Sequence, residues 1–339
     1  MSFEKFIELI GLDGKNTLQK SQIDKEFHDP FITSLYRRAN TDLKTTLKSC
    51  LGMSNEYFNV WSHIFVFIYF VTVRFPLAFA TETLKEPLHW PLLALAVGIL
   101  FLFLLSVSAH ALNCMSKEAR HRCFYFDYAG ISIFGMTTGQ ALYFYCRQLN
   151  ATGVDGKRED LLTSPYIFLC TSVAGSLVTN FMMCATRRQW CTSKASYRTL
   201  SCLIPFTINT YPYLQRLINC ENSDDCDTTW LPFYLKHVLY LLLTAVVNVC
   251  KFPERRYPGR FDAFGQSHHF VHLFVFLACD QVFEFTHREM DRRRVVLGVH
   301  PIKPDIYNSV LLTVIGVLAN LIIAWFFNAE AEDEEKKEK

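Results

Sequence analysis

Eight runs of about 20 predominantly apolar residues constrain the fold of this sequence more than any other feature. An α-helix of this length spans the roughly 30 Å hydrocarbon core of a bilayer. We therefore predict an all-α integral membrane protein, a bundle of seven core transmembrane helices plus an eighth; the weaker alternative is a large soluble helical core. The runs are Val60–Ala80, Trp90–Asn113, Phe124–Cys146, Pro165–Cys184, Leu200–Ile218, Leu231–Cys250, His268–Phe285 and Tyr307–Phe327.

The composition agrees with this prediction. Half of the 339 residues are hydrophobic and 19% are charged, which excludes an intrinsically disordered chain, a collagen-like repeat and a small disulfide-stapled secreted domain. The fifth run is the least regular, because Pro205, Pro212 and Arg216 interrupt it. Proline is tolerated in a membrane helix where neighbouring helices satisfy the freed carbonyl groups, so we keep this run as a helix.

Lys and Arg residues collect on one side of the predicted bundle. With the N-terminus in the cytoplasm, the cytoplasmic segments hold 22 of the 34 Lys and Arg residues and the outer loops hold 9, as the positive-inside rule requires. The exception is the loop after the seventh run, which places Arg292, Arg293 and Arg294 outside. We predict intracellular termini and three parts: a cytoplasmic N-terminal segment (1–55), a multi-pass membrane domain with a zinc site near its cytoplasmic face (56–327), and a charged cytoplasmic tail (328–339).

Three local features bear on the compartment. Asn150 begins a glycosylation sequon in an outer loop. Cys220 and Cys226 are candidates for a disulfide in another outer loop, with Cys146 as a competing partner. Lys336 and Lys337 are the fourth and third residues from the end. This spacing indicates either a signal for retrieval to the endoplasmic reticulum or simply a charged, solvated tail. We place the protein in the plasma membrane, with the endoplasmic reticulum or another endomembrane as the alternative.

Ionisable residues collect at one end of four predicted helices. Such residues cost roughly 2.5–3.5 kcal/mol each at the bilayer centre unless they are paired or functional. His268 and His272 are four residues apart, so both imidazoles lie on one helix face. His110 lies at the same depth, at the end of the second run. Since three His ligands with an open fourth position are typical of catalytic zinc, we predict that these three residues bind zinc.

Further polar residues surround this predicted site. Asp127 follows His110 across a short loop, and Ser106 lies one helical turn before His110. Both could hydrogen-bond to a water at the fourth position, and they are the catalytic candidates if the protein is a hydrolase. Glu56, Asn59 and His63 form a polar stripe on the first helix, which we assign to hydrogen bonds that support the bundle. The alternative for all the His residues is interhelical hydrogen bonding without a metal.

At these residues the sequence resembles the progestin and adipoQ receptor family over nearly the whole membrane region. Residues 89–93 (HWPLL) and the eighth run are more similar to the membrane progestin receptor branch, whereas residues 127–131 (DYAGI) are more similar to the adiponectin receptor branch. Three motifs in the same order carry the resemblance: Glu56xxAsn59xxxHis63; Ser106xxxHis110 followed by Asp127-Tyr128; and residues 253–262 (PERRYPGRFD) leading into Ser267-His268xxxHis272.

The resemblance implies a seven-helix core with an intracellular N-terminus and a zinc ion held by His110, His268 and His272. It implies a receptor for a steroid or related membrane lipid, with a G protein or another signalling partner and no nucleic-acid partner. Some family members resemble amide hydrolases that act on ceramide, so the alternative is a zinc-dependent membrane lipid amide hydrolase with Asp127 as general base and Ser106 beside it. A third hypothesis is a structural zinc in a protein that acts through partner contacts.

Overall fold

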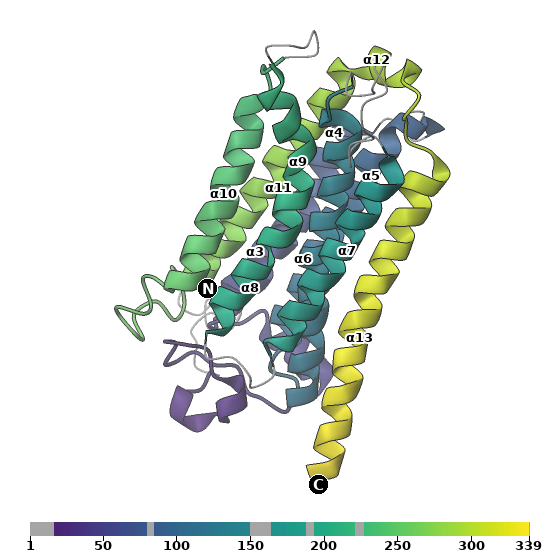
Figure 1. Ribbon diagram of the computed structural model, residues 1–339. Coiled ribbons are helices and arrows are strands. Elements are labelled where there is room, and N and C mark those ends of the chain that lie inside the picture. Colours follow the sequence, from purple (N-terminus) through teal and green to yellow (C-terminus); the bar gives the residue numbers. More distant parts are fainter. Residues whose placement is uncertain (1–16, 80–84, 150–163, 188–192, 221–226, 339) are drawn as a thin grey trace.

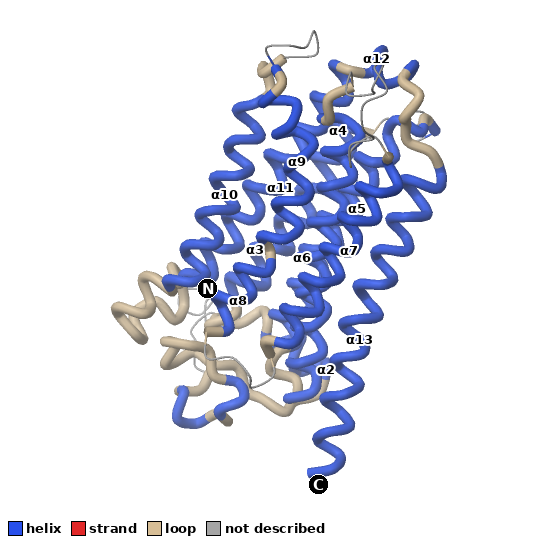
Figure 2. The backbone as a smooth tube through the Cα atoms, viewed as in Figure 1, coloured by secondary structure: helices blue, strands red, loops and turns tan. Residues whose placement is uncertain are grey.

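The structure, a computed structural model, describes residues 17–79, 85–149, 164–187, 193–220 and 227–338 (Figure 1). These residues form a helical bundle without a β-strand (Figure 2), and one isolated antiparallel bridge joins Leu18 to Tyr36. The prediction of an all-α fold is therefore confirmed.

Most of the helices run side by side along one axis, as Figure 1 shows. The first is α3 (Tyr57–Tyr69), which continues through the π-helical turn η3 (Phe70–Arg74) into α4 (Phe75–Ala78). The other long helices are α5 (Trp90–Leu112), α6 (Lys117–Cys146), α7 (Pro165–Ala185), α9 (Leu203–Ile218), α10 (Leu231–Cys250), α11 (Ser267–Arg292) and α13 (Leu312–Glu338). The short helices are α2 (Leu43–Ser49), α8 (Lys194–Ser201) and α12 (Arg294–Val299).

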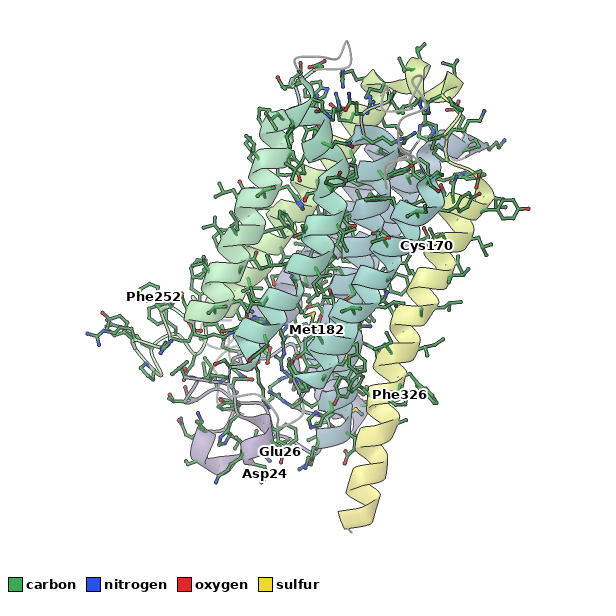
Figure 3. All side chains as sticks on the ribbon, viewed as in Figure 1. Asp24, Glu26, Cys170, Met182, Phe252 and Phe326 are labelled. Atoms are coloured by element: carbon green, nitrogen blue, oxygen red, sulfur yellow. The ribbon has the colours of Figure 1, made fainter. Side chains whose placement is uncertain are left out.

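Five helical stretches are long and apolar enough to cross a membrane: Tyr57–Ala78, Pro87–Leu112, Pro165–Ala185, Leu231–Cys250 and Ile306–Ala329. In the α10 stretch only 11% of the span is buried inside the bundle, so its apolar side chains face outward. Phe326 on α13 and Cys170 on α7 likewise lie on the outside (Figure 3). This outward apolar surface is typical of an integral membrane protein.

Helices α6, α9 and α11 do not meet that criterion of length and apolarity, although they lie alongside the other five. Helix α9 has only 16 residues, and α11 extends about two turns beyond the predicted run into a charged segment. Helix α6 occupies the centre of the bundle, where it packs against α5, α7, α9 and α13. Buried helices of this kind carry polar side chains that face other helices, which lowers their hydropathy.

The three arginines that contradict the positive-inside rule bind partners at their own end of the bundle. Arg292 pairs with Asp227 at 3.1 Å, and Arg294 pairs with Glu86 at 3.2 Å. Arg293 is buried and donates hydrogen bonds to backbone carbonyls at the end of α6. These local partners bind the three arginines at the end of the bundle opposite the one where most other Lys and Arg residues lie.

Arg216, which interrupts the fifth run, is also bound inside the protein. Its guanidinium lies 2.7 Å from the Glu289 carboxylate, and both side chains are at most 2% exposed. Helix α11 thus supplies a carboxylate partner for this cation inside the bundle.

The N-terminal segment packs across the end of the bundle where α5 ends and α11 begins. Arg37 donates hydrogen bonds to the carbonyl oxygens of His110 (2.6 Å) and Ala111 (2.9 Å) at the end of α5. Asp262, in the loop before α11, accepts hydrogen bonds from the backbone and hydroxyl groups of Thr33 and Ser34. The segment thus contacts both helices that carry the predicted ligands.

Candidate metal centre and adjoining cavity

Three imidazoles from two helices converge in the structure. His110 lies in the last turn of α5, and His268 and His272 lie in the first turns of α11. The Nε2 atom of His268 is 3.1 Å from Nε2 of His110 and 3.2 Å from Nε2 of His272. These three residues could hold a metal ion, as the helical spacing predicted.

The donor set fits zinc. Tetrahedral zinc with nitrogen ligands at about 2.0–2.1 Å places the ligand atoms roughly 3.3 Å apart, and the two short Nε2 separations are close to this value. Three neutral imidazoles leave a fourth position for a water or a ligand, as in catalytic zinc sites. The described residues add no fourth His, Cys, Asp or Glu atom to this cluster.

A carboxylate orients the first of these imidazoles. Glu56, at the N-terminus of α3, accepts a hydrogen bond from His110 Nδ1 at 2.7 Å, and amide groups of Asn59 (2.7 Å) and Asn113 (2.6 Å) donate to the same carboxylate. Burial alone would raise the pKa of Glu56, but the adjacent His110 and Arg37 hold that pKa below its ordinary value. A carboxylate on the far nitrogen fixes the tautomer that presents Nε2 to a metal.

Two other residues of α3 contact the His272 imidazole. Ser62 Oγ lies 3.0 Å from Nδ1 of His272, which orients that ring in the same way. His63 stacks on His272 with ring centroids 3.6 Å apart, and its Nδ1 lies 3.0 Å from Ser106 Oγ. His63 is therefore placed to support the site by packing and hydrogen bonding rather than to contribute to the three-His cluster.

A cavity of about 1470 Å³ is bordered by two of the three His residues, His110 and His268, and by Asp127. The Ser106 hydroxyl is a hydrogen-bond neighbour of the Asp127 carboxylate. On one side of these residues the cavity reaches the N-terminal segment at Lys25 and Asp29. On the other side it enters the bundle. From there the cavity extends between α6, α9, α10 and α11 to His237 on α10. The structure thus places both predicted catalytic candidates beside the triad, and Asp127 borders the cavity directly.

Some site residues were not predicted from the sequence. Ser62 and Asn113 were missed, although both lie within a few residues of predicted positions, and Arg37 gives no signal because it lies in a polar segment. Cys220 is bonded in a disulfide and Cys146 is free. Cys226 and the sequon residue Asn150 lie outside the described residues, so the disulfide pairing and the glycosylation stay predictions.

We expect Glu56→Gln to weaken zinc binding roughly 10- to 100-fold, because an amide is a poorer acceptor for His110 Nδ1 than a carboxylate. Competition titration of the purified protein against a zinc-chelating dye measures this change. Glu86→Gln is the matched control, since Glu86 is exposed and lies just before the start of α5, at the end of that helix opposite His110. An unchanged affinity in Glu56→Gln would contradict the orienting role.

A bundle of membrane-length helices with three convergent imidazoles and an adjoining cavity defines an integral membrane protein with a candidate intramembrane metal centre. The chain belongs to the haemolysin-III related family, whose model matches residues 51–280, and the predicted resemblance to progestin and adipoQ receptors is confirmed.

The relatives are named membrane progestin receptors and match nearly the whole chain. The chain is 28% identical to membrane progestin receptor delta of Homo sapiens over 95% of this chain and 92% of the relative. It is 25% identical to membrane progestin receptor gamma-A of Danio rerio, covering 91% and 92%. It is 27% identical to membrane progestin receptor gamma of Mus musculus, covering 89% and 90%.

Proposed function

We propose that this protein is a multi-pass membrane receptor that binds a steroid or related lipid inside its helical bundle, next to a three-His zinc site near the cytoplasmic face. The observation that carries the proposal is the cavity of about 1470 Å³ that adjoins the triad. A cavity this large, within helices whose outer faces are apolar, is suited to a lipophilic ligand. The relatives' names, membrane progestin receptors, support a steroid as that ligand.

A route for a lipid between two helices supports the same proposal. Within the described residues, α10 packs mainly on α11 and has little contact with α9. Residues of both α9 and α10 border the cavity, including Asn209 and Leu242. A lipid could therefore enter from the bilayer between α9 and α10.

The residues at the triad would have separate roles. Glu56 and Ser62 orient His110 and His272, so that zinc, when bound, would supply a Lewis acid that polarises a carbonyl of the ligand. Asp127 borders the cavity beside His110 and accepts or holds a proton there, with Ser106 as its neighbour. This arrangement is compatible with a receptor that recognises a carbonyl group of its ligand, and it is equally compatible with a hydrolase.

The second candidate function, a lipid amide hydrolase, is favoured by cations at the cavity. Arg187, Arg198 and Lys251 border it and hydrogen-bond to neutral groups. Within the described part of the chain none of these three forms an ion pair with a carboxylate. Unneutralised cations near the triad would stabilise the carboxylate of a released fatty acid.

One experiment separates the two functions. In zinc-loaded protein in lipid nanodiscs, we expect saturable progesterone binding and no release of fatty acid from ceramide above the level of Asp127→Ala. Radioligand binding and mass spectrometry of the fatty acid measure these quantities. Fatty acid release well above that of Asp127→Ala, without saturable steroid binding, would assign the hydrolase instead.

We also propose that both termini are cytoplasmic and that eight helices cross the membrane, with α13 as the eighth. The disulfide-bonded Cys220 supports this orientation, because disulfides form in oxidising compartments. Cys220 follows the end of α9, which is tied through Arg216 to Glu289 at the end of α11 remote from its two predicted zinc ligands. An epitope tag after Lys339 should be unreachable by antibody in intact cells and reachable after permeabilisation. Labelling of intact cells would contradict the proposed orientation of the C-terminus.

A further inference from the structure

A second polar position lies inside the cavity, away from the triad. His237 on α10 borders the cavity and is 3% exposed. Its Nδ1 atom is 2.9 Å from the carbonyl oxygen of Ala278 on α11. Since a carbonyl can only accept, Nδ1 carries the proton and Nε2 of the neutral ring is an acceptor. No group among the described residues donates a hydrogen bond to Nε2.

A hydroxyl on the opposite helix borders the same cavity. Ser132 on α6 is 1% exposed, and its Oγ atom has no hydrogen-bond partner among the described residues. Buried polar atoms in native proteins nearly always have a partner, so an unpaired one calls for an explanation. A ligand in the cavity would supply the partner.

The two groups lie at similar depth along the bundle. Both α6 and α11 run away from the triad. Ala278 follows His272 by six residues on α11, which corresponds to about 9 Å along the axis. Ser132 follows Asp127 by five residues on α6, which corresponds to about 7.5 Å. His237 and Ser132 therefore form one polar level above the level of the metal centre.

We propose that His237 and Ser132 bind a hydroxyl group at the far end of a rigid lipid whose other polar end approaches the three His residues. This inference rests on the proposed function and specifies its ligand class. The fused rings of a steroid keep its terminal oxygens apart, whereas a ceramide gathers its amide and hydroxyl groups at one end. Because His237 Nε2 accepts, the distal oxygen must donate, which selects a hydroxyl over a ketone.

The test compares two steroids that differ only in this oxygen. Testosterone carries a distal hydroxyl and androstenedione a ketone, while the rest of the two molecules is the same. In zinc-loaded full-length protein, we expect testosterone to bind about tenfold more tightly, which is the effect of one buried hydrogen bond. Equal affinities would overturn the inference, and so would failure of both steroids to bind.

Variants of His237 test whether this residue causes the preference for testosterone over androstenedione. Asparagine can keep the hydrogen bond to Ala278 but lacks an acceptor at the Nε2 position, so His237→Asn should reduce the preference to within about twofold, whereas His237→Gln should retain part of it. Ser132→Ala should weaken testosterone binding several-fold. Tyr240→Phe, on the same helix but outside the cavity lining, is the control. A full preference in folded His237→Asn would overturn the assignment.

Progesterone binding in the same preparation separates this inference from the proposed function. Saturable progesterone binding with no preference between the two test steroids would overturn only the distal subsite. Absence of progesterone binding, with zinc present and the protein monodisperse on size-exclusion chromatography, would overturn the proposed receptor function and the subsite together.

Discussion

Replacing His272 with alanine should lower bound zinc from about one ion per purified chain to a small fraction of that amount. Two imidazoles alone make an incomplete site, since zinc in proteins takes at least three side-chain ligands in most cases. His110→Ala should have the same effect, and it also removes one of the three side-chain donors to the Glu56 carboxylate. Inductively coupled plasma mass spectrometry of the purified proteins measures the metal directly.

The control for these variants is His269→Ala. His269 directly follows a predicted ligand, but its Nδ1 accepts a hydrogen bond from the backbone of Gly265 at 3.0 Å, and it does not belong to the three-His cluster. Its replacement should leave zinc in place. A wild-type protein that is stable and metal-free would exclude every zinc hypothesis for this chain.

Replacing Glu289 with leucine should destabilise the bundle by roughly 3–5 kcal/mol, because it removes this carboxylate from Arg216 while the guanidinium stays buried. Arg292 also loses a partner at 3.0 Å, which adds a smaller term because that side chain is partly exposed. Denaturant or thermal unfolding in detergent measures the change. Glu86→Leu, which removes an exposed partner of Arg294, should cost at most about 1 kcal/mol.

The double variant Arg216→Met with Glu289→Leu tests why Glu289→Leu lowers the stability of the bundle. If the cost arises from a buried charge without its partner, removal of both charges should recover most of the lost stability. If the double variant is as unstable as Glu289→Leu alone, the cost arises from packing or from Arg292 instead.

The convergence of the three imidazoles at one depth could be predicted from the sequence, because helical spacing and the alternation of helix direction determine it. The spacing of His268 and His272 places them on one helix face, and the alternation of helix direction brings His110 to the same depth. Which side chains orient these imidazoles could not be predicted, because that depends on how α3 is rotated about its axis. In the structure, α3 is rotated so that Glu56 contacts His110 and Ser62 contacts His272.

The conformation of the N-terminal segment could not be predicted from the sequence. Within residues 30–49 the structure has an α-helix only from Leu43 to Ser49. Phe31, Leu35 and Asn40 adopt positive φ angles, which no helix tolerates. The cause is tertiary: the backbone N–H groups of Thr33 and Ser34 bind the Asp262 carboxylate, 229 and 228 residues further along the chain, and local periodicity carries no information about such a contact.

The contacts of Arg37 and Asp262 have a thermodynamic consequence. Arg37 holds the backbone of a predicted zinc ligand on α5, and Asp262 ties the same segment to the loop that leads into the two ligands on α11. A metal bound by the three imidazoles would favour the arrangement in which α5 and α11 lie together, as docking of this segment does. The two equilibria would then be coupled, and by reciprocity a partner that pulls the segment away would lower metal affinity by the same factor by which the metal opposes its removal.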